Sequence, residues 1–488
     1  MWGLCSLIVA LSLMSQETAR ALTLRERDSP AIVALDIKRK DILDPIERDR
    51  LRRKRDTTTI DQAIDNEETL YFCNITLGTP GQSLRLVLDT GSSDLWCNAA
   101  NSTFCSSSTD PCRISGSYNP NNSSTYAYVS SDFNISYADG TGAAGAYATD
   151  SLHIGGASLN DFQFGIGYSS SSSEGVLGIG YTSNEVQVGR FNKGAYANLP
   201  RAMVEGNLIK SNAYSLWLND LDANTGSILF GGVNTKKYHG ELQTLPIQKV
   251  DGIYSEFIIA LTGVTLSSSS KTRTYSSDVL PAAVLLDSGS SLTYLPDSIV
   301  EDIYKDLDVL YEQSSRVGYV PCTLGQNDTN ITYMFSSPAI TVAVNELVLN
   351  VGDLLFKNGE RACIFGIVPA GDSTAVLGDT FLRSAYVVYD LANNEISLAN
   401  TNFDNTGDNI LEIGTGEDSV PGATKVAHPV TTVAADGSGA RIGGPSGPIF
   451  TEAPSATGRS IAPVRLKNAP KNLVFGAAVI GYILAFYL

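Results

Sequence analysis

Two aspartates of this chain lie in closely matched surroundings. Asp89 and Asp287 each follow a run of aliphatic residues, and each precedes a hydroxyl residue, a glycine and a Ser-Ser pair. The aliphatic runs predict buried strands that end at the acids. A buried carboxylate is costly unless it is hydrogen-bonded or shares a proton. Two such groups placed face to face cannot both ionise easily, so together they would supply a general base and a general acid.

The distance between the two motifs suits a fold with two similar lobes. They lie 198 positions apart. A single Asp-Thr-Gly is more often a turn, because Asp and Thr bond nearby backbone groups and Gly supplies positive φ. The matched lead-ins and tails favour an internal repeat instead. We therefore predict that folding brings Asp89 and Asp287 together.

Further segments accompany the two motifs along the chain. They are 71–72, 75–80, Trp96, 135–142, 176–178 and 375–399. In this order they resemble the pepsin family of aspartic proteases, over about residues 71–399. The resemblance implies an all-β, bilobal fold with two pseudo-symmetric, β-barrel-like lobes and an active-site cleft between them. We place the lobes at 56–235 and 236–400.

The resemblance also implies a role for each motif residue. Asp89 and Asp287 would be catalytic and would activate one water for attack on a peptide bond. They would titrate as a pair, so neither has a private pKa. The residues that support them would be Thr90, Gly91, Ser92, Ser288, Gly289 and Ser290.

The segment around Tyr137 is expected to form a flap over the cleft. A tyrosine on an exposed hairpin is often only a cross-strand partner. The glycines at Gly140 and Gly142 predict a mobile tip, which could exclude water and hold substrate. By resemblance, Tyr137, Asp139 and Gly140 would face substrate, and the Trp96 indole would bond the Tyr137 hydroxyl.

The sequence lacks the residue patterns that other catalytic mechanisms require. The three histidines, His153, His239 and His428, are widely spaced and do not form a ligand-like group. The chain has no Gly-x-Ser-x-Gly elbow and no complete phosphate-binding fingerprint. We expect no metal and no cofactor. A net charge of −17 argues against nucleic acid as a partner.

The composition agrees with an all-β protein. Short apolar runs alternate with Ser and Thr and are separated by Gly, Asn and Pro. The clearest helix is predicted over 298–310, with Pro296 just ahead of it.

The N-terminal region indicates secretion and processing. Residues 1–21 resemble a signal peptide, with an apolar stretch over 4–14. Residues 22–55 would be a pro-segment, removed after Arg55 by a protease of the kexin type. The first 55 residues contain 12 Lys or Arg and 8 Asp or Glu, whereas the chain as a whole has 34 and 51. This cationic segment would attract the anionic enzyme, and we expect a basic residue at 38–40 to cover the two aspartates.

The C-terminal region indicates a membrane anchor. Residues 401–472 are rich in small and polar residues and predict a flexible stalk. The apolar run 473–488 is short for a transmembrane helix and resembles a GPI signal, with attachment at Ser455. Together these features resemble the GPI-anchored, yapsin-like fungal branch of the family. They imply a secreted enzyme at the outer face of the cell membrane or in the cell wall, with a preference for basic residues near the scissile bond.

Six of the seven cysteines lie after the signal segment, and an even number in a secreted chain implies disulfides. Cys322 and Cys363 stand alone in the second half and should pair. The other four allow three pairings, of which Cys105–Cys112 matches the family and leaves Cys73–Cys97. The Cys105–Cys112 loop is short, unlike the long acidic insertion of some yapsins. Glycosylation sequons occur at Asn74, Asn101, Asn122 (overlapping Asn121), Asn134, Asn327 and Asn330.

Two functions from different classes remain. The first is an active aspartic endopeptidase that acts on polypeptides as a monomer. The second is a catalytically silent, glycosylated surface protein that keeps the protease-like shell for binding. The intact Asp motifs and Tyr137 favour the first.

Overall fold

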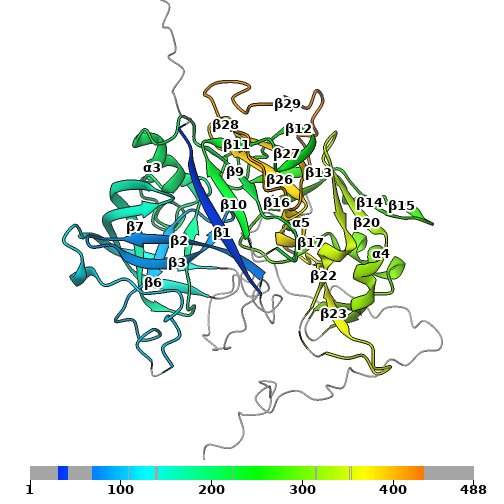
Figure 1. Ribbon diagram of the computed structural model, residues 1–488, viewed down its shortest axis with the longest axis horizontal. Helices are drawn as coiled ribbons and strands as arrows, with labels where there is room; N and C mark the ends of the chain where they lie inside the picture. Colours follow the sequence, from blue (N-terminus) through cyan, green and yellow to red (C-terminus); the bar gives the residue numbers. More distant parts are fainter. Residues whose placement is uncertain are drawn as a thin grey trace, which may run out of the picture.

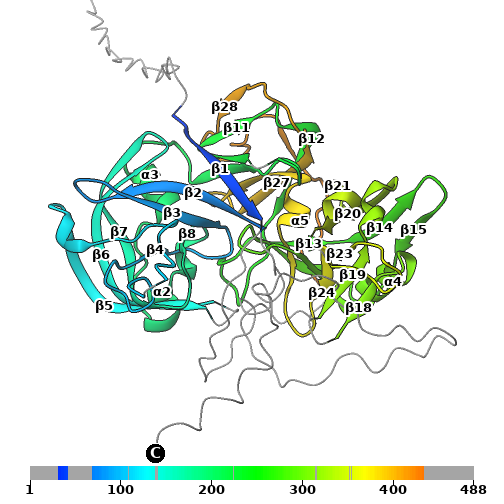
Figure 2. The ribbon, with the colours of Figure 1, turned by 60° about the horizontal axis from the view of Figure 1, so that its bottom comes forward.

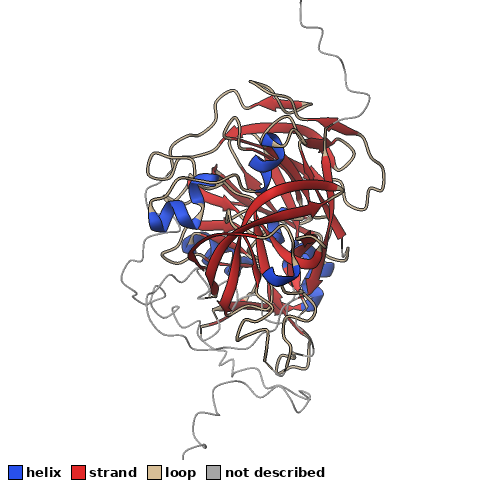
Figure 3. Ribbon diagram, turned by 90° about the vertical axis from the view of Figure 1, so that its left-hand side faces the viewer, coloured by secondary structure: helices blue, strands red, loops and turns tan. Residues whose placement is uncertain are grey.

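The protein folds into two lobes of short β-strands. The computed structural model describes residues 31–41, 69–107, 109–137, 141–223, 225–313, 316–350, 352 and 354–433. Residues coloured blue to cyan form one lobe and residues coloured green to yellow form the other (Figures 1 and 2). Strands make up most of the described chain, with a few short helices among them (Figure 3). Among the helices of the described ranges, none combines the length and the apolar character that a bilayer span requires.

The first lobe is one part of a 14-stranded sheet. Its strands pair mainly as antiparallel neighbours, with two parallel pairs. The strands of this lobe are β2 (Thr69–Leu77), β3 (Gln82–Asp89), β4 (Leu95–Asn98), β5 (Ala127–Ser136), β6 (Gly142–Ile154), β7 (Ala157–Ser170) and β8 (Gly175–Gly178). Two short helices, α2 (Val186–Phe191) and α3 (Leu199–Glu205), follow.

The second lobe repeats the parallel pair around the second Asp motif, since β16 and β25 run parallel as β3 and β8 do. Its five-stranded sheet contains β13 (Ile258–Leu261), β16 (Ala282–Leu286), β25 (Ala375–Leu377), β17 (Thr293–Leu295) and β24 (Ile367–Pro369). Two four-stranded sheets complete the lobe: β14 (Gly263–Ser268), β15 (Thr272–Tyr275), β20 (Thr329–Met334) and β21 (Ala339–Ala343), and β18 (Leu310–Glu312), β19 (Val317–Pro321), β22 (Val348–Leu349) and β23 (Ala362–Phe365).

Five further strands of the 14-stranded sheet lie between the two lobes. These are β9 (Ala213–Trp217), β10 (Thr225–Phe230), β12 (Tyr238–Pro246), β26 (Ala385–Asp390) and β27 (Glu395–Thr401). The sheet also contains β1 (Val33–Asp41), which comes from the predicted pro-segment and pairs with β10 on one side and β2 on the other. The side chains of Val33, Leu35 and Ile37 are buried in the core. Strand β1 is therefore an integral part of the sheet, between the lobes (Figure 2).

Two expectations about charged and helical segments need correction. Lys38 and Arg39 lie in β1, and neither is among the residues that line the pocket of the two aspartates. The side chain of Lys40, the third candidate, lies outside the described residues, so the prediction for it stays a prediction. The predicted helix is α4 (Asp297–Asp306), which ends four residues early. Asp308 has a φ of 52°, in the left-handed region that a continuing helix cannot adopt.

The predicted flexible stalk is wrong for its first part. β28 (Ile410–Glu412) pairs with β11 (Gly232–Asn234), and β29 (Ala423–Lys425) pairs with β12. The side chains of Ile413 and Val420 are buried between these strands and the sheet. The folded unit therefore extends past Thr401 to about residue 426. The rest of the predicted stalk after 433, the tail 473–488 and Ser455 lie outside the described residues.

A chain that ends at Thr401 should be less stable than one that ends at Val433. Loss of the buried Ile413 and Val420 side chains alone removes about 3 to 6 kcal/mol of apolar burial. Urea unfolding of the two truncated proteins measures the difference. Equal midpoints would show that the 402–426 segment contributes nothing to the folded unit.

The cysteines of the described residues form two disulfides. Cys105–Cys112 and Cys322–Cys363 are bonded. The predicted bond Cys73–Cys97 is wrong, because both residues are buried free thiols. β3 and β8 lie between β2 and β4. Three strand spacings are roughly 14 Å, whereas a disulfide needs Cα atoms within about 7 Å.

Candidate active site

The two aspartates lie in one cleft. Asp89 ends β3 and Asp287 follows β16, and both line a cavity of about 490 Å³ whose walls come from both lobes. Asp89 is 1% exposed and Asp287 is 9% exposed. A Cβ atom on Gly91 would lie only 2.6 Å from Asp287 Oδ1. The second carboxyl group therefore packs directly against the first motif, and only glycine leaves room for it.

Each carboxyl group accepts the same pair of hydrogen bonds from its own motif. In both, the backbone N–H two residues later donates to Oδ1 and the serine hydroxyl three residues later donates to Oδ2. The donors are Gly91 N (2.9 Å) and Ser92 Oγ (2.6 Å) to Asp89, and Gly289 N (2.8 Å) and Ser290 Oγ (2.6 Å) to Asp287. These bonds fix the orientation of both carboxyl groups and satisfy buried oxygens.

The hydroxyl residues of the two motifs bond across the lobe interface. Thr90 Oγ1 donates to Leu286 O (2.9 Å) and accepts from Ser288 N (3.0 Å). Ser288 Oγ donates to Leu88 O (3.0 Å) and accepts from Thr90 N (3.2 Å). The arrangement uses only the hydroxyl groups, which explains why serine serves in the second motif.

In each lobe, a glycine lets the neighbouring strand pack closely against the loop of the Asp motif. Gly178 in β8 and Gly378 after β25 follow matching apolar residues. A Cβ atom on Gly178 would lie 2.6 Å from Ser93 N, and one on Gly378 would lie 2.4 Å from Ser290 O. Any larger residue would push the motif loop out of place, so these glycines help to position the carboxyl groups.

The flap tyrosine is held by the predicted tryptophan. Trp96 Nε1 donates to the Tyr137 hydroxyl (2.6 Å), and Tyr137 N donates to Thr141 O (2.8 Å) across the hairpin of β5 and β6. Tyr137 lines the cleft. Asp139 and Gly140 lie outside the described residues.

Removal of the Tyr137 hydroxyl should weaken substrate turnover moderately. We expect Tyr137→Phe to lower kcat/KM roughly three- to tenfold, which is the range of one hydrogen bond. Tyr168→Phe is the matched control, because Tyr168 is exposed on β7 and does not line the cleft. Equal kinetics for both variants would show that the Trp96 bond does not matter for catalysis.

A second pair of acidic side chains, which was not predicted, lies in the same cleft. Asp94 is buried and accepts from the hydroxyls of Tyr147 (2.7 Å) and Tyr196 (3.0 Å), and from Val186 N (2.9 Å). Its place just after the first motif, between Ser93 and an apolar residue, was a usable signal. The sequence around Glu185 contained no such signal, because nothing near it indicates that its side chain is buried.

Glu185 is fully buried in the cleft wall. Its Oε2 accepts from Tyr196 N (2.9 Å), and its Oε1 has no hydrogen-bond partner. Burial, with a smaller contribution from the neighbouring Asp94 carboxyl, raises the pKa of Glu185 to about 9, against the hydrogen bond from Tyr196 N. Burial also raises the pKa of Asp94, against the hydrogen bonds that it accepts.

The remaining predicted positions are surface features or lie outside the described chain. Exposed sequon asparagines are Asn74, Asn101, Asn122, Asn134 and Asn327, whereas Asn330 in β20 is half-buried. Arg55 lies outside the described residues. Within the described part of the chain, no three His, Cys, Asp or Glu side chains come together as metal ligands would.

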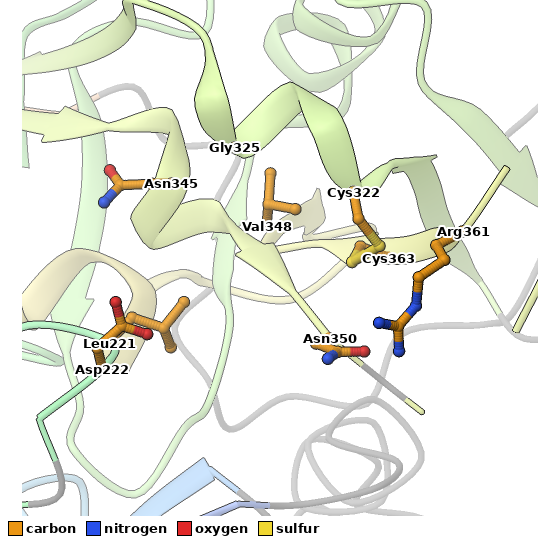
Figure 4. A pocket seen from close by; sticks show the side chains of 9 residues that line it. All are labelled: Leu221, Asp222, Cys322, Gly325, Asn345, Val348, Asn350, Arg361 and Cys363. Carbon is orange, nitrogen blue, oxygen red and sulfur yellow. A yellow bond between two sulfur atoms is a disulfide. The ribbon is translucent and has the colours of Figure 1, made fainter. Parts of the chain in front are cut away.

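A separate pocket of about 260 Å³ lies beside the second disulfide (Figure 4). Asp222 and Arg361 lie on opposite sides of it in this view, and Cys322–Cys363 lies at its edge. It contains no residue of either Asp motif. The two pockets are therefore distinct, and the chemistry described above belongs to the larger one.

Comparisons with known proteins agree with this geometry. The family model described as eukaryotic aspartyl protease matches residues 70–401. The probable aspartic-type endopeptidase opsB of Aspergillus oryzae is 74% identical, over 98% of this chain and 99% of that one. The aspartic proteinase yapsin-3 of Saccharomyces cerevisiae is 36% identical, over 74% of this chain and 71% of its own.

A solved structure shows the same fold at low sequence identity. The aspartic proteinase from Irpex lacteus is 17% identical, with a TM-score of 0.57 over 77% of this chain and all of that one. This chain is therefore similar to known aspartic proteinases in fold as well as in sequence. With both family motifs paired in one cleft, the chain belongs to the eukaryotic aspartyl protease family and is an aspartic-type endopeptidase.

Proposed function

We propose that Asp89 and Asp287 hydrolyse internal peptide bonds through one shared water at acidic pH. The observation that carries this proposal is the matched pair of carboxyl groups in a single cleft, each with the same two donors. One ionised carboxylate removes a proton from the water as it attacks the peptide carbonyl. The other carboxyl, protonated, donates to the carbonyl oxygen, and the departing amine then takes a proton from the pair.

Acidic pH suits this arrangement because the pair must hold one proton. The hydroxyls of Thr90 and Ser288 keep the two motifs in register during the reaction. No covalent intermediate with the enzyme is required.

Substrates with basic residues near the scissile bond are the second part of the proposal. Glu256 lines the cleft with the two aspartates, and the chain carries a net charge of −17. Both would favour the approach of cationic polypeptides. The similarity to yapsin-3 supports the same branch of the family.

The third part of the proposal concerns location. A signal at 1–21, processing after Arg55 by a kexin-type protease and GPI attachment near Ser455 would leave a monomeric, glycosylated enzyme on the outer face of the cell membrane or in the cell wall. Release of the native protein from intact cells by a phosphatidylinositol-specific phospholipase tests the anchor. Protein that stays cell-bound through its own C-terminal span would contradict it.

The catalytic proposal is tested on purified, processed protein. Denatured protein substrate should be cleaved at acidic pH, and a statine-type inhibitor should stop the cleavage. A peptide library then reports the residues around each cleaved bond, with enrichment of Lys or Arg expected. Absence of cleavage would favour a silent binding protein, and inhibitor-resistant cleavage would point to another mechanism.

A further inference from the structure

One wall of the cleft is assembled around the buried Asp94 and Glu185. Asp94 lies between β3 and β4, just after the motif that contains Asp89. Its Oδ2 accepts from Val186 N, at the start of α2, and its Oδ1 accepts from the hydroxyl of Tyr196. Glu185 accepts from Tyr196 N. These bonds hold α2 and the segment after it against the first catalytic loop.

The same wall is linked to the flap. Tyr147, which donates to Asp94, belongs to β6, the second strand of the flap hairpin. Arg190 in α2 donates through Nη1 to Asn134 O (2.7 Å) in β5, and Lys193 forms an ion pair with Asp132 in the same strand. A shift of α2 would therefore be felt both at the catalytic loop and at the flap.

The charges around Glu185 all have the same sign when ionised. In the part of the chain that the structure describes, the titratable groups facing it are Asp94 from the catalytic loop, Tyr147 from β6 and Tyr196 from the segment after α2. A carboxylate at Glu185 would thus be buried beside another acid, with one oxygen unpartnered. An unpaired buried charge of this kind is strongly unfavourable.

We propose that Glu185 is a positioning residue that builds this wall only while its carboxyl group is uncharged. At acidic pH the neutral group lets Asp94 keep α2, Tyr196 and the flap strand in place beside Asp89. When Glu185 ionises, repulsion and desolvation loosen α2 and the cleft wall is lost. The group thereby makes the assembled cleft progressively less stable as pH rises above the ordinary pKa of a glutamate.

The direction of the pH effect follows from proton binding. In the unfolded chain Glu185 ionises near its ordinary pKa of 4.5, whereas burial raises its pKa in the folded chain to about 9. Between these values the folded state keeps a proton that the unfolded state has released. The stabilisation is complete below pH 4.5 and is lost as pH rises toward 9, up to tenfold in the folding equilibrium constant for each pH unit.

Glu185→Gln tests the inference, because glutamine matches the neutral acid in shape and cannot ionise. Wild type and variant are held at pH 4.5 to 8.5 and then assayed at acidic pH, each normalised to its own sample held at pH 4.5. We expect wild type to lose activity progressively above about pH 6, and the variant to keep at least threefold more after the pH 8 hold. The return to acidic pH removes the reversible titration of the Asp pair from the measurement.

Glu205→Gln is the matched control. Glu205 is exposed on α3 and pairs only with Arg201 among the described residues, so its loss changes the net charge equally without touching the wall. It should behave as wild type. Superimposable pH curves for Glu185→Gln and wild type would overturn the inference.

The activity assay above rests on the proposed catalytic function, whereas urea unfolding tests the role of Glu185 independently of that function. Stability is measured from pH 5 to 8 on wild type and on the Asp89→Asn protein, which reports on folding whether or not the pair is catalytic. We expect stability to fall with rising pH in both. Stability that is flat or rises over this range would refute the inference, even if Glu185→Gln failed to fold.

Discussion

Asp89→Asn and Asp287→Asn should each lower kcat/KM for peptide hydrolysis at acidic pH by at least about 1,000-fold. An amide can neither take a proton from water nor share one with the opposite carboxyl group. The hydrogen-bond donors of each motif and the bonds of Thr90 and Ser288 across the lobes remain, so the fold should persist. Steady-state kinetics with a substrate peptide identified in the library screen measures the effect.

The control must change an aspartate to asparagine without touching the cleft. Asp161 is exposed and has a φ of 53°, a left-handed conformation that asparagine tolerates equally well. Asp161→Asn should keep wild-type kinetics. If either cleft variant retained more than a tenth of wild-type kcat/KM, one carboxyl group would suffice and the shared-water mechanism would be wrong.

Glu346→Ala should lower the free energy of unfolding by about 3 to 5 kcal/mol, the cost of leaving a buried charge unpaired. Arg383 is 0% exposed and Glu346 is 3% exposed. Arg383 Nε lies 2.6 Å from Glu346 Oε2, and its Nη2 donates to Glu346 O. Glu346 Oε1 also accepts from Leu221 N (3.2 Å), so the pair ties the loop after β9 to the second lobe. Urea unfolding at fixed pH measures the loss.

An exposed pair provides the comparison. Arg201 and Glu205 form an ion pair on α3 with both side chains more than half exposed, and Glu205→Ala should cost at most about 1 kcal/mol. Replacing Arg383 and Glu346 together by Met and Leu should recover part of the loss, because both charges of the pair are then removed. If Glu346→Ala cost no more than Glu205→Ala, the buried pair would not stabilise the fold.

The fold class and the two-lobed cleft could be predicted because their signals are local. An apolar run that ends in Asp-hydroxyl-Gly specifies a buried strand and the turn after it, and the second copy specifies a second lobe. Pro296 marked the start of α4 for the same reason, since it restricts the backbone on its own. The end of α4 was missed because the left-handed Asp308 is one of many residues that tolerate either conformation.

The sequence by itself therefore determined the chemistry-bearing motifs, the strand-rich architecture and the positions of the glycines that bring backbone close. Only the tertiary structure decided that two strands separate Cys73 from Cys97, that residues 402–426 pack on the sheet and that Glu185 is buried beside Asp94. Strand order, burial and the pKa of a carboxyl group depend on neighbours far away in the sequence. Such neighbours leave no periodic or local pattern, and they exist only once the chain has folded.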